Sequence, residues 1–101
     1  MRRPRHPGEV LRREYVVRRG MSGRELSRAL GVANSRLAKV LNAELSVTPD
    51  LALRLSKASG RTAGAWMSMQ MNYDLWKARQ EVDLRGVRRL RGRRRRRGRR
   101  G

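Results

Sequence analysis

Four neighbouring polar residues carry the clearest chemistry in this chain, and that chemistry is recognition rather than catalysis. They lie in the segment NSRLAK and are Asn34, Ser35, Arg36 and Lys39. Arginine can donate two hydrogen bonds to guanine O6 and N7, and asparagine can pair at two points with adenine. We therefore take these four residues as candidates for reading DNA bases, against the alternative that they form only a solvated helix face.

The residue types that usually perform catalysis or bind metals form no comparable group. His6 is the only histidine, cysteine is absent, and the carboxylates of Glu14, Glu25, Glu44 and Asp74 are scattered along the chain. We interpret His6 as a surface histidine and the carboxylates as helix caps or surface charges. The chain is therefore not expected to be an enzyme, to hold a metal ion or to need a cofactor.

The net charge indicates a polyanionic partner. The 101 residues include 27 Lys and Arg against 8 Asp and Glu, which gives a formal charge of +19, and about half of it follows residue 80. The basic N-terminus leads into no apolar segment, and no run of 18 apolar residues occurs. We expect one soluble, cytoplasmic and nucleoid-associated domain with a small core and no membrane partner.

Helical periodicity and cap residues predict an all-α body of five helices at residues 7–80, between a basic arm at 1–6 and a tail at 81–101. The first helix is expected from Pro7 to about Arg18, with either Val16 or Val17 on its inner face. Thr48 and Thr62 are expected to cap the fourth and fifth helices, and Gly60 to end the fourth.

A capping box marks the start of the second helix, because Ser22 and Glu25 can each bond the other's backbone amide. Its inner residues Leu26, Ala29 and Leu30 precede Gly31, which suits a left-handed helix end. A third helix then begins with the four base-reading candidates. The second and third helices, joined by the turn at Gly31, are therefore expected to form a helix-turn-helix. The candidates for phosphate contact beside it are Ser22, Arg24 and Ser46.

The fifth helix carries two apolar stripes on nearly opposite faces. One consists of Ala65, Trp66, Met69, Tyr73 and Trp76, and the other of Met67, Met71, Leu75 and Ala78. A body of about 80 residues can cover one stripe, so the other is expected to form a homodimer interface. The sequence pattern does not tell which stripe packs on the core and which forms the dimer interface.

The last half of the tail reads RGRRRRRGRRG and cannot form a core. We expect it to be disordered and to act as a non-specific nucleic-acid clamp, against the alternative of a run without a role. The arginines of this clamp are Arg93, Arg94, Arg95, Arg96, Arg97, Arg99 and Arg100.

Several motifs together resemble the HigA family of antitoxins, a branch of the lambda-repressor-like helix-turn-helix proteins. They are HPGE at 6–9, the block from Ser22 to Val32, NSRL at 34–37, TPDLALRL at 48–55 and WMSMQMNYDLWKA at 66–78. The resemblance covers about residues 6–80. It implies a five-helix dimer that binds an inverted-repeat operator, represses its own operon and neutralises a HigB or RelE-like toxin, a ribosome-dependent mRNA endonuclease.

The chain departs from the family pattern at three places. Gly23 stands where the family usually has Gln, which removes a side chain that would brace the DNA contacts. Ala43 stands where the family usually has Gly, so we expect the exit from the third helix to be strained or differently shaped. The tail from Glu81 onward lies outside the resemblance.

Two other functions fit the same residues. One is a stand-alone helix-turn-helix repressor without a toxin, and the other is an RNA-binding or nucleoid-coating protein that binds mainly through its arginine-rich tail. A neighbouring gene for a RelE-like protein would favour the antitoxin.

Overall fold

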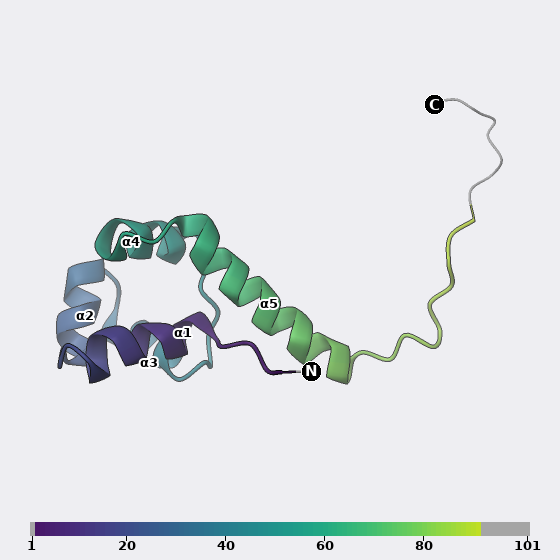
Figure 1. The fold of residues 1–101 in the computed structure, drawn as a ribbon, viewed down its shortest axis with the longest axis horizontal. Helices are drawn as coiled ribbons and strands as arrows, with labels where there is room; N and C mark the ends of the chain where they lie inside the picture. The colour runs from purple at the N-terminus through teal and green to yellow at the C-terminus, as the bar shows by residue number, and fades with distance from the viewer. Residues whose placement is uncertain (1, 92–101) are drawn as a thin grey trace, which may run out of the picture.

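The computed structural model describes residues 2–91, and within them it has the predicted all-α fold (Figure 1). Its helices are α1 (Pro7–Leu11), the π-helical segment η1 (Arg12–Val17), α2 (Gly23–Leu30), α3 (Asn34–Leu41), α4 (Pro49–Ser59) and α5 (Ala63–Glu81). Since η1 continues α1, the two together make the single first helix expected from the sequence. The helices from α1 to α4 gather in one bundle, whereas α5 begins on this bundle and extends beyond it.

A single apolar core holds the bundle together. Its buried members are Leu11, Leu26, Leu30, Leu37, Val40, Leu41, Val47, Leu51, Ala52, Leu55 and Trp66. Every helix from α1 to α5 supplies at least one of them, and Val47 comes from the loop between α3 and α4. Burial of apolar surface on this scale is the main force that fixes α2 and α3 against their neighbours.

The helix ends follow the predicted caps. The Ser22 hydroxyl accepts from the Glu25 amide and the Glu25 carboxylate accepts from the Ser22 amide, and Thr48 and Thr62 each accept from an amide of the first turn. These caps satisfy amides that a helix start otherwise leaves unpaired.

The inner face of the first helix is formed by Val16 rather than Val17. Val16 packs on the core, whereas Val17 is 70% exposed.

His6 is buried and only 1% exposed, so its interpretation as a surface histidine is wrong. Its Nδ1 accepts a hydrogen bond of 2.9 Å from the Gly8 amide, its own amide donates to Glu9, and its ring lies edge-on to Tyr73 at 4.9 Å. Burial lowers the pKa of His6 because desolvation penalises the imidazolium, although the carboxylates of Glu9 and Asp74 oppose this shift. A neutral His6 therefore caps α1 and anchors it to α5.

Gly8 brings α1 into backbone contact with α3. A Cβ atom added at Gly8 would lie 1.8 Å from the carbonyl oxygen of Val40, which is far inside contact distance. Only glycine permits this approach. The HPGE segment is thus a structural unit that caps α1 and sets its distance from α3.

Gln70 fixes α5 against the loop that follows α3. Its Oε1 accepts from the Val47 amide at 2.7 Å, and its Nε2 donates to Asp74 at 2.9 Å. Although Gln70 lies between the two apolar stripes in the sequence pattern, it is buried.

None of the helices in residues 2–91 is long and apolar enough to cross a membrane.

Candidate nucleic-acid interface

The turn between α2 and α3 has the geometry that the sequence predicts. Gly31 takes a left-handed conformation with φ of 70°, and the Val32 amide returns to the Ser27 carbonyl at 3.1 Å. This closure ends α2 and changes the direction of the chain within a few residues, so that α3 starts at Asn34. The arrangement is a helix-turn-helix whose second helix is α3.

Three of the four base-reading candidates lie on the exposed face of α3, namely Asn34, Ser35 and Lys39. On the opposite face, Leu37, Val40 and Leu41 are buried in the core. The two faces are separated because the apolar residues recur at helical spacing. The core therefore holds α3 from behind and leaves its polar side accessible.

The candidates for phosphate contact surround this face. Ser22 and Arg24 lie at the start of α2 and Ser46 lies in the loop after α3, and all three are exposed. Glu25 is engaged by Ser22, and the hydrogen bond from the Ser22 amide lowers the pKa of this carboxyl group. No residue in this set is buried, so phosphate contacts remain open to all three.

Gly23, the first residue of α2, has room for a side chain. A Cβ atom there would lie 3.9 Å from Oδ1 of Asn34, which is an ordinary van der Waals distance. The position adjoins the start of α3, and the Cβ atom of the glutamine usual in the family would meet no clash there.

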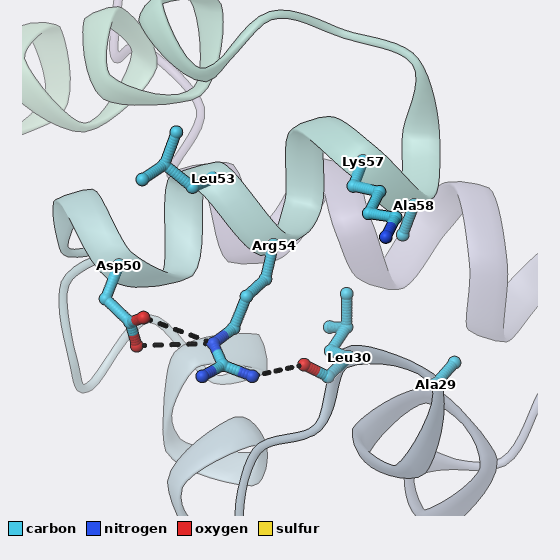
Figure 2. Close-up of a pocket in the computed structure, with 7 residues that line it drawn as sticks. All are labelled: Ala29, Leu30, Asp50, Leu53, Arg54, Lys57 and Ala58. Atoms are coloured by element: carbon cyan, nitrogen blue, oxygen red, sulfur yellow. Dashed lines mark hydrogen bonds and ion pairs between the residues drawn. The ribbon is translucent and has the colours of Figure 1, made fainter.

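Ala29, an expected inner residue of α2, is exposed instead, and Ala58 of α4 is exposed as well. They line a groove of about 600 Å³ between these helices, together with Leu53 and Arg54 among others (Figure 2). Leu30 and Leu55 provide the core contacts of these two helices. Ala65 at the start of α5 is also exposed.

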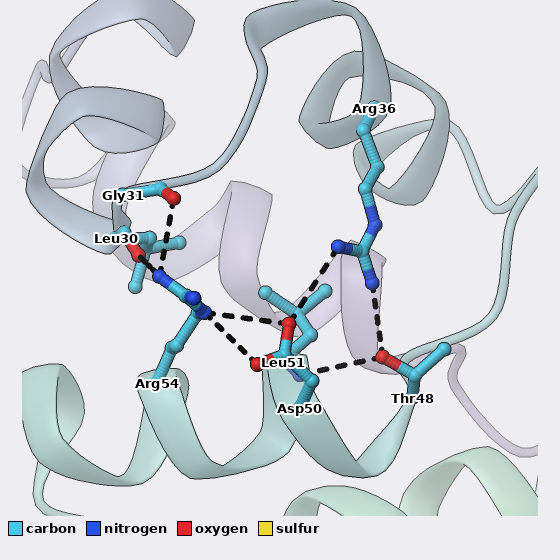
Figure 3. Close-up of polar contacts among 7 residues, drawn as sticks. All are labelled: Leu30, Gly31, Arg36, Thr48, Asp50, Leu51 and Arg54. Atoms are coloured by element: carbon cyan, nitrogen blue, oxygen red, sulfur yellow. Dashed lines mark hydrogen bonds and ion pairs between the residues drawn. The ribbon is translucent and has the colours of Figure 1, made fainter.

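Arg36 differs from the other base-reading candidates because its guanidinium is bound within the protein. Nη2 donates to the Thr48 hydroxyl at 2.9 Å, and Nη1 lies 3.8 Å from the Asp50 carboxylate (Figure 3). Thr48 and Asp50 belong to the start of α4, where the sequence predicts only a cap at Thr48. The structure adds Asp50 to this surface.

The two stripes of α5 have different environments. Trp66 is fully buried, Met69 packs on the core and Tyr73 contacts His6, so the first stripe faces the bundle over most of its length. Trp76 continues that stripe as a half-buried side chain, with its ring 5.9 Å from that of Tyr73.

The second stripe of α5 is divided. Met67 packs on the core, whereas Met71 and Leu75 are 54% and 44% exposed. Val82 follows the helix and is also exposed. The accessible apolar surface of α5 therefore begins at Met71, and Met67 belongs to the core instead.

The tail is described only as far as Arg91. Val82, Leu84, Val87 and Leu90 are exposed in this segment, and Arg85 pairs with Asp83. The arginines assigned to the clamp, Arg93–Arg97, Arg99 and Arg100, lie outside the described residues.

Comparison with known proteins identifies the class to which this helix-turn-helix belongs. Residues 12–64 match the helix-turn-helix family. The virulence-associated protein I of Dichelobacter nodosus is 42% identical over 76 residues, which cover 75% of this chain and 70% of that protein. Antitoxin HigA-1 of Vibrio cholerae is 32% identical over 78 residues, which cover 77% of this chain and 73% of that protein.

Solved structures agree with these relatives. Antitoxin GraA superimposes with a TM-score of 0.82 and 39% identity, covering 89% of this chain and all of that one. GraA in complex with its operator superimposes with a TM-score of 0.80 and 38% identity, covering 90% of this chain and 95% of that one. The chain belongs to the helix-turn-helix family of DNA-binding regulators, in its HigA-type antitoxin branch. Since these regulators are not enzymes, the family also confirms the prediction that the chain is not one.

Proposed function

We propose that this protein is the antitoxin of a toxin–antitoxin module and that it binds an inverted-repeat operator as a homodimer to repress its own operon. The observation that carries the proposal is the exposed polar face of α3, which directly follows the Gly31 turn while the core holds the helix from behind. A helix so placed enters the major groove in helix-turn-helix proteins. The protein then acts on the bacterial nucleoid in the cytoplasm.

The charge of the chain supports DNA as the partner. The formal net charge is +19, and Arg24 and Lys39 lie exposed around the face of α3. Phosphate contacts position such a protein, while base contacts from Asn34, Ser35 and Arg36 supply its sequence preference. The tail adds further phosphate contacts that do not depend on sequence.

Footprinting on the protein's own promoter tests the operator proposal. We expect a protected palindrome whose half-sites lie one helical turn, about 34 Å, apart, because a two-fold dimer presents two copies of α3. Asn34→Ala should weaken operator binding by about tenfold and remove the preference at one base pair in each half-site. Asn72→Ala, an exposed substitution of the same kind on α5, should change neither. Absence of a protected palindrome would contradict the proposed function.

The exposed part of α5 supports dimerisation. Met71, Leu75 and Ala78 follow one another at spacings of four and three residues, which is the spacing of a helix–helix seam, and the exposed Val82 comes directly after the helix. Met71→Asp with Leu75→Asp should give folded monomers, whereas Trp66→Asp should unfold the bundle because Trp66 is fully buried. Sedimentation of the wild-type protein at tens of micromolar should show a dimer, and a folded monomer there would contradict this assignment.

We further propose that the toxin is a RelE-like mRNA endonuclease encoded beside this gene. The support is the similarity to proteins named as antitoxins. Expression of the neighbouring gene should arrest growth, and co-expression of this chain should relieve the arrest. If the neighbouring gene causes no arrest, the chain is a stand-alone repressor.

A further inference from the structure

The side chain of Arg36 points toward the start of α4. It donates to the Thr48 hydroxyl at 2.9 Å and lies 3.8 Å from Asp50 (Figure 3). The Arg36 side chain is 35% exposed and the Asp50 side chain is 60% exposed, so water reaches both partners. Both terminal nitrogens of Arg36 are turned toward α4, so the side chain must leave Thr48 and Asp50 before it can direct this fork at guanine.

Asp50 has a second arginine partner. Nε of Arg54 lies 3.2 Å from Oδ1 of Asp50, and Nη1 of Arg54 donates to the carbonyl oxygens of Leu30 and Gly31, both at 3.1 Å. Arg54 therefore ties Asp50 to the turn of the helix-turn-helix. If Arg36 leaves, Asp50 keeps the Arg54 ion pair and no isolated charge results. Release of Arg36 therefore leaves no unpaired carboxylate. It also costs little free energy, since exposed ion pairs are weak.

We propose that Asp50 is a specificity-determining residue that holds Arg36 away from DNA until a guanine in the operator replaces it; this rests on the proposed function. On random DNA, Arg36 stays with Asp50 and Thr48 and makes no phosphate contact. On the operator, two hydrogen bonds to guanine replace the contacts that Arg36 loses. Asp50 thus prevents one cation of the recognition helix from binding any phosphate within reach.

The substitution Asp50→Asn tests this function because it removes the charge and keeps the size of the side chain. With Arg36 released, random DNA should gain one phosphate contact, so the slope of log affinity against log salt should steepen by about 0.9. The slope on operator DNA should stay the same, while operator affinity rises by no more than about fivefold. Asp50→Ser, which also favours a helix start, should act in the same direction.

Glu81→Gln is the matched control. It removes the same charge at the last residue of α5, and Glu81 forms no ion pair within residues 2–91. This variant should leave the random-DNA slope unchanged. In an Arg36→Ala background, Asp50→Asn should likewise have no more effect than Glu81→Gln, because the residue that Asp50 restrains is gone.

The outcomes separate the two proposals. If the wild-type protein prefers its operator but Asp50→Asn and Glu81→Gln change the random-DNA slope alike, or if Asp50→Asn acts equally with and without Arg36, Asp50 does not restrain Arg36 and the inference is overturned. Weaker binding of Asp50→Asn to both DNAs would overturn it as well, since Asp50 would then only position α4. A wild-type protein without operator preference would refute the proposed function itself.

Discussion

Replacing Ala43 by glycine should stabilise the protein. Ala43 has a φ of 62° and is the only residue other than glycine with positive φ among those described. The Glu44 amide donates to the Lys39 carbonyl at 2.8 Å and the Ala43 amide to the Val40 carbonyl at 3.0 Å. These two bonds form a Schellman motif, in which the left-handed position that Ala43 occupies normally belongs to glycine.

The size of the effect follows from two opposing contributions. The left-handed conformation costs a residue with a Cβ roughly 1–2 kcal/mol, and glycine removes this strain. Glycine also makes the unfolded chain more flexible, which returns about 0.4–1 kcal/mol. The free energy of unfolding should therefore rise by about 0.5–1 kcal/mol. For a domain of this size, the melting temperature should increase by about 2–8 °C.

Thermal and urea unfolding followed by circular dichroism measure this change. Ala38→Gly is the matched control, because Ala38 is exposed in the middle of the same helix, where glycine should lower stability by about 0.8–1 kcal/mol. The same substitution should thus act with opposite signs five residues apart. A loss of stability in Ala43→Gly would refute the strain at the end of α3.

Four further predictions concern other parts of the chain. Gly8→Ala should lower the free energy of urea unfolding by about 3 kcal/mol, the upper end of the usual range for overpacking, since the new Cβ would overlap the Val40 carbonyl; an unchanged stability would contradict the close packing. Because the folded-state pKa of His6 is lowered, the stability from neutral His6 is complete above about pH 6.5 and is lost as the pH falls from there through the folded-state pKa. Urea titrations at several pH values should show this loss in the wild type, beyond any loss in His6→Asn. Gly23→Gln should fold normally and raise operator affinity in a gel-shift titration, whereas a folded variant with weaker binding would exclude a bracing role at this position. Deleting Arg85–Gly101 should weaken binding to operator and scrambled DNA by similar factors and reduce the salt slope by several units without lowering the melting temperature, and an unchanged slope would show that the tail is idle.

Local features of this protein could be read from the sequence because they depend on residues close together in the chain. The capping box at Ser22 and the left-handed turn at Gly31 join groups within a few residues of each other, so their residue types suffice to predict them. The helical spacing of the apolar residues likewise turns Leu37 inward and leaves Asn34 and Lys39 on the exposed face, where base-reading residues are expected. The strained position of Ala43 followed from a single departure from the family pattern.

The structure decided the features that join distant segments. His6 is buried because Tyr73, far along the chain in α5, covers its ring, and Gln70 is buried because it bonds the Val47 amide. Neither residue type indicates burial, since glutamine is mostly exposed in proteins and histidine is intermediate. The role of Gly8 depended in the same way on where α3 lies.

Arg36 shows the same division within the candidate site. Its position in the third helix was sufficient to propose base contacts, and its neighbours on the exposed face are placed as expected. The sequence could not show that the guanidinium turns to Thr48 and Asp50, because a long side chain has several rotamers and the choice among them depends on which acceptors lie within reach. The sequence by itself determined the helices, their caps and the polar face of α3. The tertiary structure alone decided which partners those side chains meet, because these contacts arise only when α1, α3, α4 and α5 pack together.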